Sequence, residues 1–107
     1  MTNEPTALSH AQKKYLRALG HDLGPVVYIG KEGLSESVVA AIEEALDSHE
    51  LIKIKLINTG TISKHEAAAR VPERANAQLV QLIGKTLLVY RRNKNRKRGE
   101  QIQLPAK

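Results

Sequence analysis

The loop Gly30-Lys31-Glu32-Gly33 carries the residue types best suited to binding chemistry in this chain. Its two glycines allow the backbone to approach a ligand without interference from a Cβ atom. Ser35 is placed to cap a following helix, whose first amides would favour a phosphate group. Lys31 adds a mobile cation. The loop therefore predicts a phosphate-binding turn, and a plain strand-to-helix turn is the alternative that the loop by itself leaves open.

Cations that lie elsewhere in the sequence are expected to form one surface around this loop. Lys13, Arg17 and His21 lie four residues apart and form one basic stripe on a predicted helix, with Lys14 beside them. A solvated helix face is the other interpretation of such a stripe. The candidate RNA-binding residues are the loop, this stripe, two strand lysines, the lysine of a hairpin turn and the basic tail: Gly30, Lys31, Glu32, Gly33, Lys13, Lys14, Arg17, Lys53, Lys55, Lys85, Arg91, Arg92, Arg96, Lys97 and Arg98.

The net charge of +6 comes entirely from the C-terminal segment. Residues 1–90 hold ten basic and ten acidic residues, whereas residues 91–107 hold seven basic residues and one acid, Glu100. A basic arm on a neutral domain indicates a polyanion partner, most often nucleic acid. A tail that only increases solubility is the alternative.

A pattern of four residues, G-x-x-G, clamps nucleic-acid backbone in KH domains, which favours a nucleic-acid partner for the Gly30–Gly33 loop too.

No catalytic set is found. His65-Glu66 begins an HExxH pattern, but Ala69 stands where the second zinc ligand would be. The four histidines have no metal-ligand spacing, and the chain has no cysteine. Gly24 is one residue too far from Gly30-Lys31 for a P-loop. We therefore expect a protein that is not an enzyme and that has no cofactor and no metal. The rival hypothesis is a small phosphotransfer or nucleotide-binding enzyme that uses the Gly30-Lys31 loop. Thermal stabilisation of the protein by ATP or GTP with magnesium would support it.

The elements that must position these residues alternate between helix and strand. Capping patterns at Ser9, Ser35 and Ser63 predict three helices, and apolar runs predict strands at residues 26–29, 51–57, 79–83 and 86–90. Gly84-Lys85 suits a type II′ hairpin turn. The predicted fold is α/β, a single compact domain with a four-stranded mixed sheet and about three helices in the order α-β-α-β-α-β-β.

Strand 51–57 alternates, with Ile52, Ile54 and Leu56 on one face and Lys53 and Lys55 on the other. We expect the helices mainly on the apolar face, which would leave the lysine face open to solvent. The second helix is acidic and should face away from nucleic acid.

Few aromatic residues are available for stacking on bases. The chain has three tyrosines, no Phe and no Trp. Tyr15 and Tyr28 fall in apolar patterns and are expected in the core. We therefore expect recognition of RNA backbone and shape, with no platform for splayed bases.

We expect a flexible N-terminus at residues 1–7, a domain at residues 8–91 and a basic tail at residues 92–107. Ile102 and Leu104 could pack the end of the tail back onto the domain. No apolar run is long enough for a membrane span, and the N-terminus shows no signal peptide. A cytoplasmic monomer is the resulting expectation.

Four stretches, taken in order, resemble the CRM domain in its small stand-alone bacterial, YhbY-like form. They are Gln12-Lys13-Lys14-Tyr15-Leu16-Arg17, residues 30–38 (GKEGLSESV), residues 49–55 (HELIKIK) and residues 79–86 (LVQLIGKT). The likeness covers Leu8 to Tyr90, about three-quarters of the chain.

The resemblance implies a fold like the C-terminal domain of bacterial translation initiation factor three. It also implies an RNA-binding protein that associates with precursors of the large ribosomal subunit. Related domains serve group II intron splicing in plant organelles, and the G-x-x-G loop is the family's proposed RNA contact. The function we expect is docking on structured ribosomal RNA during large-subunit assembly. A general nucleic-acid (DNA or polyanion) binding protein is the alternative.

Two residues depart from the family pattern. Pro72 stands where the family usually has an unbroken helix, and we expect it to kink the third helix or split it near Val71. Asn76 stands where a helix-ending glycine is common, and asparagine can adopt the same left-handed conformation.

Overall fold

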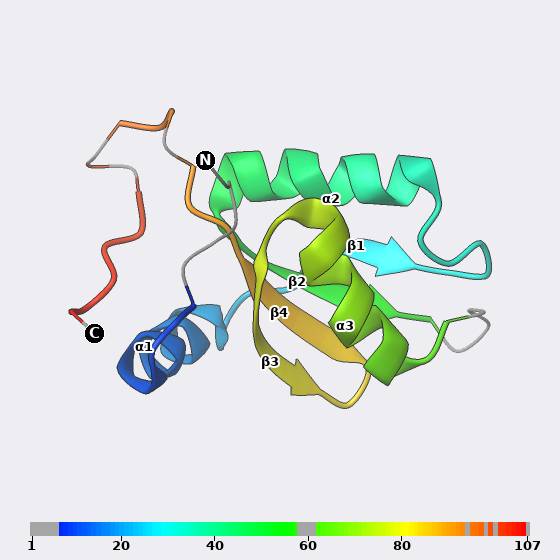
Figure 1. Ribbon diagram of the computed structural model, residues 1–107, viewed down its shortest axis with the longest axis horizontal. Helices are drawn as coiled ribbons and strands as arrows, with labels where there is room; N and C mark the ends of the chain where they lie inside the picture. The colour runs from blue at the N-terminus through cyan, green and yellow to red at the C-terminus, as the bar shows by residue number, and fades with distance from the viewer. Residues whose placement is uncertain (1–6, 58–61, 94, 98, 100, 107) are drawn as a thin grey trace.

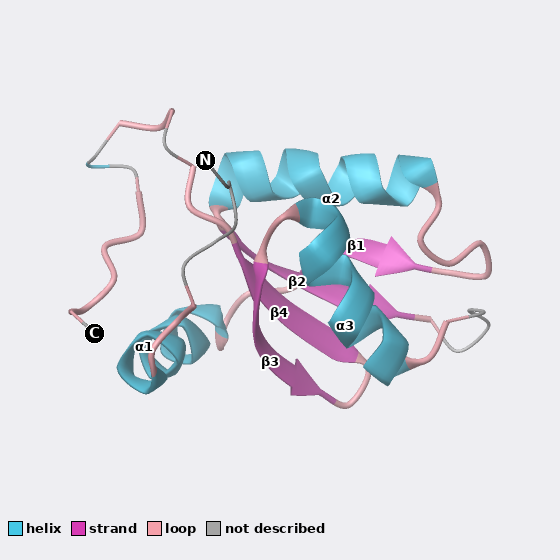
Figure 2. Cartoon of the chain, in the orientation of Figure 1, coloured by secondary structure: helices cyan, strands magenta, loops and turns pink. Residues whose placement is uncertain are grey.

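The structure is a computed structural model that describes residues 7–57, 62–93, 95–97, 99 and 101–106. Three helices and four strands alternate in the predicted order (Figures 1 and 2). Their bounds are α1 His10–Gly20, β1 Pro25–Ile29, α2 Glu36–His49, β2 Leu51–Leu56, α3 Lys64–Ala75, β3 Gln78–Ile83 and β4 Thr86–Tyr90. The strands form one mixed sheet in the order β1-β2-β4-β3, in which only β1 and β2 are parallel. The predicted α/β fold is confirmed.

Local sequence signals set the helix starts. Ser9 accepts a hydrogen bond from the Gln12 amide, and the Gln12 side chain accepts one from the Ser9 amide, which completes a capping box. Ser35 caps α2 through Val38 N, and Ser63 caps α3 through Glu66 N. All three predicted helix starts are confirmed.

The main core lies between one face of the sheet and the helices α2 and α3. Alternate strand residues supply it, among them Ile29, Ile54 and Leu87, each fully buried. Ile42 and Leu46 of α2 and Val71 of α3 close it from the helix side. The predicted alternation of β2 is confirmed, since Lys53 and Lys55 point to the face opposite this core.

The opposite face of the sheet is partly covered, which corrects the expectation that it would be open. Helix α1 packs there through Leu16 against Leu51, Leu88 and Tyr90, and Ile102 and Leu104 pack against the same cluster. The physical reason is that Leu51, Leu88 and Tyr90 form an apolar patch at one end of this face that water would otherwise contact. The predicted packing of Ile102 and Leu104 onto the domain is confirmed.

The expectation that Tyr15 and Tyr28 are core residues is wrong. Tyr15 is 39% exposed and Tyr28 is 51% exposed, while Tyr90 is the buried tyrosine. Tyr28 lies in an edge strand whose core-facing positions are taken by Val27 and Ile29. Because side chains alternate along a strand, Tyr28 must point to the other face.

Pro72 does not split α3, which continues to Ala75 with the proline inside it. A helix interior tolerates this residue here because tertiary packing of Ala67, Val71 and Ala75 against the core outweighs one lost backbone hydrogen bond. Asn76 ends the helix in the left-handed conformation with φ 52°, as predicted. Gly84 has φ 55° in the hairpin turn, as a type II′ turn requires.

No helix within the described part of the chain is both long and apolar enough to span a membrane.

Candidate nucleic-acid interface

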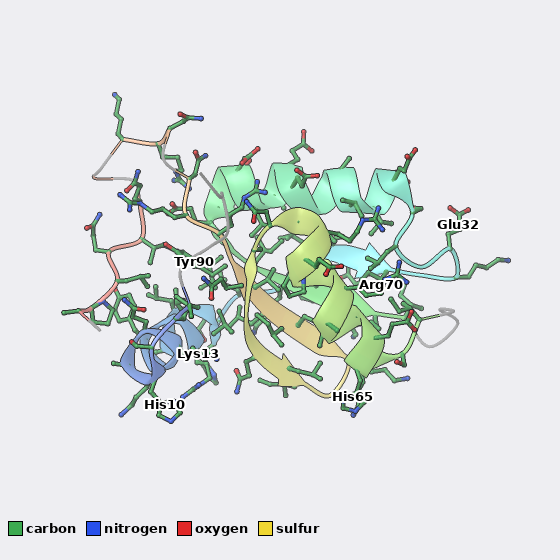
Figure 3. All side chains as sticks on the ribbon, in the orientation of Figure 1. His10, Lys13, Glu32, His65, Arg70 and Tyr90 are labelled. Atoms are coloured by element: carbon green, nitrogen blue, oxygen red, sulfur yellow. The ribbon has the colours of Figure 1, made fainter. Side chains whose placement is uncertain are left out.

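The Gly30–Gly33 loop is a tight turn at the C-terminal end of β1. The Gly33 amide donates to the Gly30 carbonyl at 3.0 Å, and Gly33 has φ 64°, a left-handed conformation that favours glycine. Lys31 and Glu32 are exposed at the tip, and Figure 3 shows the Glu32 side chain projecting away from the domain. The turn thus presents a cation and a carboxylate to solvent on a backbone that Gly33 fixes.

Lys55 and Lys85 lie at the same end of the sheet as this loop. Ile29 of β1 pairs with Leu56 of β2, and the Leu56 amide donates to the Lys85 carbonyl at 2.8 Å. Both lysines are exposed. The structure therefore brings together the loop, Lys55 and Lys85, although Gly30 and Lys85 are 55 residues apart in the sequence.

Lys53 and Arg17 meet at the boundary between α1 and the sheet. Lys53 Nζ donates to the carbonyl oxygen of His21 at 3.4 Å. A cavity of about 80 Å³ opens there, and its lining includes both cations together with Gln81, Thr86 and Leu88. Lys13 and Lys14 stand further along α1, Lys13 half-buried and Lys14 exposed.

The charges are divided between the two sides of the sheet. Glu36, Glu43, Glu44 and Asp47 are exposed on α2, which packs on the face opposite Lys53 and Lys55. The described face with the lysines is therefore the one suited to a polyanion.

The basic tail leaves the sheet at the opposite end from the loop, so the single surface expected around the loop is not formed. Leu51 pairs with Tyr90, and the chain enters the tail directly after it. Figure 1 shows the C-terminal segment and the loop after β1 at opposite ends of the molecule. The expectation failed because β4 runs antiparallel to β2, which carries the chain away from Lys85.

Arg91 is held inside the fold. Its guanidinium donates to Asp47 Oδ1 at 2.8 Å and to the Ala75 carbonyl at 2.7 Å, and it lies 3.9 Å from Glu43 Oε1. These contacts join α2 to the end of α3. Arg96 donates to the Ser48 carbonyl at 2.7 Å. Arg92 and Lys97 are exposed, and Arg98 lies outside the described residues.

Glu50 fixes the tail to the domain and was not identified from the sequence. The residue is fully buried, and its two carboxylate oxygens accept hydrogen bonds from the amides of Asn93 and Ile102, each at 2.7 Å. Glu50 also adopts φ 64°, which L residues rarely do. A buried carboxylate is tolerated when backbone amides solvate it in place of water. No local signal could have revealed this, since the partners lie 43 and 52 residues away.

Burial and the Glu50 carboxylate both affect the pKa of Tyr90. Burial raises the pKa of the Tyr90 phenol above 10.0, the Glu50 carboxylate raises this pKa further, and Arg92 partly opposes the shift. Tyr90 therefore stays neutral in the folded protein at physiological pH.

The histidines and acids do not gather into a metal site among the described residues. His10, His21, His49 and His65 are all exposed, and Figure 3 shows His10 on α1 and His65 on α3, well separated.

Several known proteins resemble the chain over most of its length. A Haemophilus influenzae protein named "RNA-binding protein" is 42% identical over 102 residues, which cover 95% of this chain and 99% of that one. "Probable RNA-binding protein YqeI" of Bacillus subtilis is 36% identical, with 92% of this chain and 99% of that protein covered.

Fold comparison agrees with the sequence comparison. The solution structure of SAV1595 from Staphylococcus aureus, a hypothetical protein with proposed RNA binding, matches with a TM-score of 0.75. The match is 36% identical in sequence and covers 92% of this chain and 100% of that one. The model of the CRS1/YhbY (CRM) domain matches residues 8–91. With a family model matched over most of its length and relatives of this similarity, the chain belongs to the CRS1/YhbY (CRM) domain family.

Proposed function

We propose that this protein binds structured ribosomal RNA and acts as an assembly factor for the large ribosomal subunit. One observation carries the proposal: the G-x-x-G loop, Lys55 and Lys85 gather at one end of the sheet, and Lys55 lies on the face opposite the acidic α2. Such a surface offers both backbone amides and cations to a phosphate backbone.

In the proposed mechanism the loop holds the RNA backbone, with Lys31 as its cation. Lys53 and the α1 residues Lys13, Lys14 and Arg17 fix the orientation of the RNA across the sheet. Arg92 and Lys97 provide a second, distant point of contact, whereas Arg91 serves to join α2 and α3. Binding of this kind needs no cofactor, and we propose a monomeric, cytoplasmic, non-catalytic protein.

RNA as the partner is supported by the names of the relatives, and the ribosomal target by the resemblance of the four sequence stretches to YhbY-like proteins. Structured RNA and duplex DNA of equal length, compared at matched salt, test the first step. We expect tighter binding of the RNA. Equal affinity would favour the alternative, a general polyanion-binding protein.

The ribosomal step is tested by sucrose-gradient sedimentation of cell extract, at low and high salt, with detection of this protein. We expect it to sediment with free or precursor large subunits and not with mature ribosomes. A protein that stays at the top of the gradient at low salt would contradict the ribosomal target without contradicting RNA binding.

A further inference from the structure

Tyr28 stands on the uncovered half of the sheet, between the loop and the lysines. It is 51% exposed, pairs with Lys55 across β1 and β2, and precedes Gly30 by two residues. We infer that Tyr28 is a stacking site for one unpaired base of the bound RNA. Aromatic rings on an open sheet face, next to cations that hold the backbone, bind single-stranded nucleic acid in this way.

The surroundings of Tyr28 suit a base. Val26 is 50% exposed and Ile57 is 44% exposed, and Ile57 Cδ1 lies 3.8 Å from the position that a Cβ on Gly30 would take. A base stacked on Tyr28 would therefore contact apolar side chains at its margins and have Lys55 beside it. Helix α1 covers the other half of this face, and about half of the Tyr28 side chain remains open to solvent.

The neighbouring cavity offers a place for a phosphate of the same RNA strand. Its volume of about 80 Å³ is small beside typical ligand pockets, so it suits a phosphate and not a whole nucleoside. Arg17 and Lys53 supply the charge, and Thr86 adds a hydroxyl donor. The cavity reaches from α1 across β2, β4 and β3, and Tyr28 lies on the next strand, β1. A single strand could thus run across the sheet from the cavity to the loop.

This inference rests on the proposed function but adds a different kind of contact. The loop and the lysines hold RNA backbone, which a fully paired helix also offers. Tyr28 would contact a base face, which an unpaired nucleotide exposes and the stacked interior of a paired helix does not. The protein would then prefer RNA in which a paired stem adjoins an unpaired loop or bulge.

Two RNAs and three variants test the inference. The RNAs are a hairpin with an unpaired loop and a fully paired duplex of equal length. The variants are Tyr28→Thr, which keeps a strand-favouring residue, Tyr28→Phe, which keeps the ring, and Tyr15→Ala. Tyr15 is the matched control because it is an exposed tyrosine on α1, 39% exposed, away from β1. Thermal unfolding checks that each variant is folded.

We expect Tyr28→Thr to weaken hairpin binding roughly 5- to 150-fold, the range that loss of one base–aromatic stack produces. Duplex binding should stay within about twofold, and Tyr28→Phe and Tyr15→Ala should resemble the parent protein. Because the chain has no Trp, its emission comes from tyrosine, and the hairpin should quench it less in Tyr28→Thr than in the parent.

Equal loss on hairpin and duplex, or no loss on either, would overturn the stacking site and leave RNA binding intact. Failure of the parent protein to bind either RNA would instead overturn the proposed function, and the stacking site with it.

Discussion

The two ends of the sheet differ on the face that carries Lys53 and Lys55. At the Leu51–Tyr90 end, α1 and the C-terminal segment cover the strands. At the Leu56–Thr86 end, the described chain leaves Tyr28, Lys55 and Lys85 exposed. One half of the face is used to hold the fold together, and the other half is available to a partner.

Cations follow the same division. At the covered end, Arg91 and Arg96 donate to backbone carbonyls and to Asp47, so part of the basic tail is engaged within the protein. At the open end, Lys31 and Lys85 are exposed on turns. A count of charges therefore overstates how many tail cations are free to meet a partner, because Arg91 and Arg96 are engaged within the fold.

The largest effect should come from breaking the covered end at Glu50. Replacing Glu50 with Ala removes the acceptor of the Asn93 and Ile102 amides and should lower the free energy of unfolding by about 3 kcal/mol, because both bonds involve a charged acceptor. Urea unfolding measures this loss.

Glu50→Gly is the matched variant. It removes the same carboxylate but suits φ 64°, so it should be about 1 kcal/mol more stable than Glu50→Ala. Equal stability of the two would show that the backbone conformation at residue 50 carries no strain. Unchanged stability in both would show that the carboxylate does not hold the tail.

Neutralising the cations at each end in turn distinguishes the contribution of the loop end from that of the tail. Lys31→Gln with Lys55→Gln alters the open end, and Arg92→Gln with Lys97→Gln alters the tail. Each pair should reduce the slope of log affinity against log salt by roughly 1.5–2, from two lost phosphate contacts. Only the open-end pair should also reduce the preference for structured RNA over duplex DNA.

Binding isotherms at several salt concentrations give both quantities. An unchanged slope in the tail pair would show that the tail does not contact phosphate. These substitutions are preferable to truncation after Arg91, which would also remove the amides that Glu50 binds.

Substitution of the two loop glycines should have different effects, one on stability and the other on RNA binding. Gly33→Ala should destabilise the domain by about 1 kcal/mol, because alanine at φ 64° is strained. Gly30→Ala should leave stability unchanged, since an added Cβ meets only Ile57 Cδ1 at 3.8 Å. It should weaken RNA binding if the backbone approaches phosphate there. Unfolding and binding measured together decide this, and full RNA affinity in Gly30→Ala would argue against close backbone approach.

The smallest effect concerns pH at the covered end. The pKa of Tyr90 is raised in the folded state. The contribution of its neutral phenol to the free energy of unfolding should therefore be fully present below pH 10 and decline as the pH rises through the folded pKa. Tyr90→Phe should decline less over the same alkaline range. Identical alkaline curves for the two proteins would contradict this assignment.

Much of the secondary structure was predictable because its causes are local. Ser9 and Gln12 form a capping box three residues apart, β2 alternates over six residues, and Gly84 sets a two-residue turn. The Gly30–Gly33 turn was predictable for the same reason, since the residues that form it are adjacent in the chain.

The predictions that failed depended on contacts between segments that lie far apart in the sequence. Tyr28 was assigned to the core from an apolar run, but its exposure depends on where α1 packs. The course of the tail depends on β4 pairing antiparallel to β2 and on Glu50 reaching Ile102, 52 residues away. Gln12 likewise donates to the carbonyl of Pro105, 93 residues away.

The sequence by itself determined the elements, their order and the chemistry of the loop, because hydrogen bonds and turn geometry within a few residues specify them. Only the tertiary structure decided which half of the lysine face is covered, that Tyr28 is exposed and that the basic tail lies far from the loop. Those outcomes depend on the burial of apolar area between distant segments and on the hydrogen bonds that distant backbone amides donate to the buried Glu50 carboxylate. No short stretch of sequence encodes either.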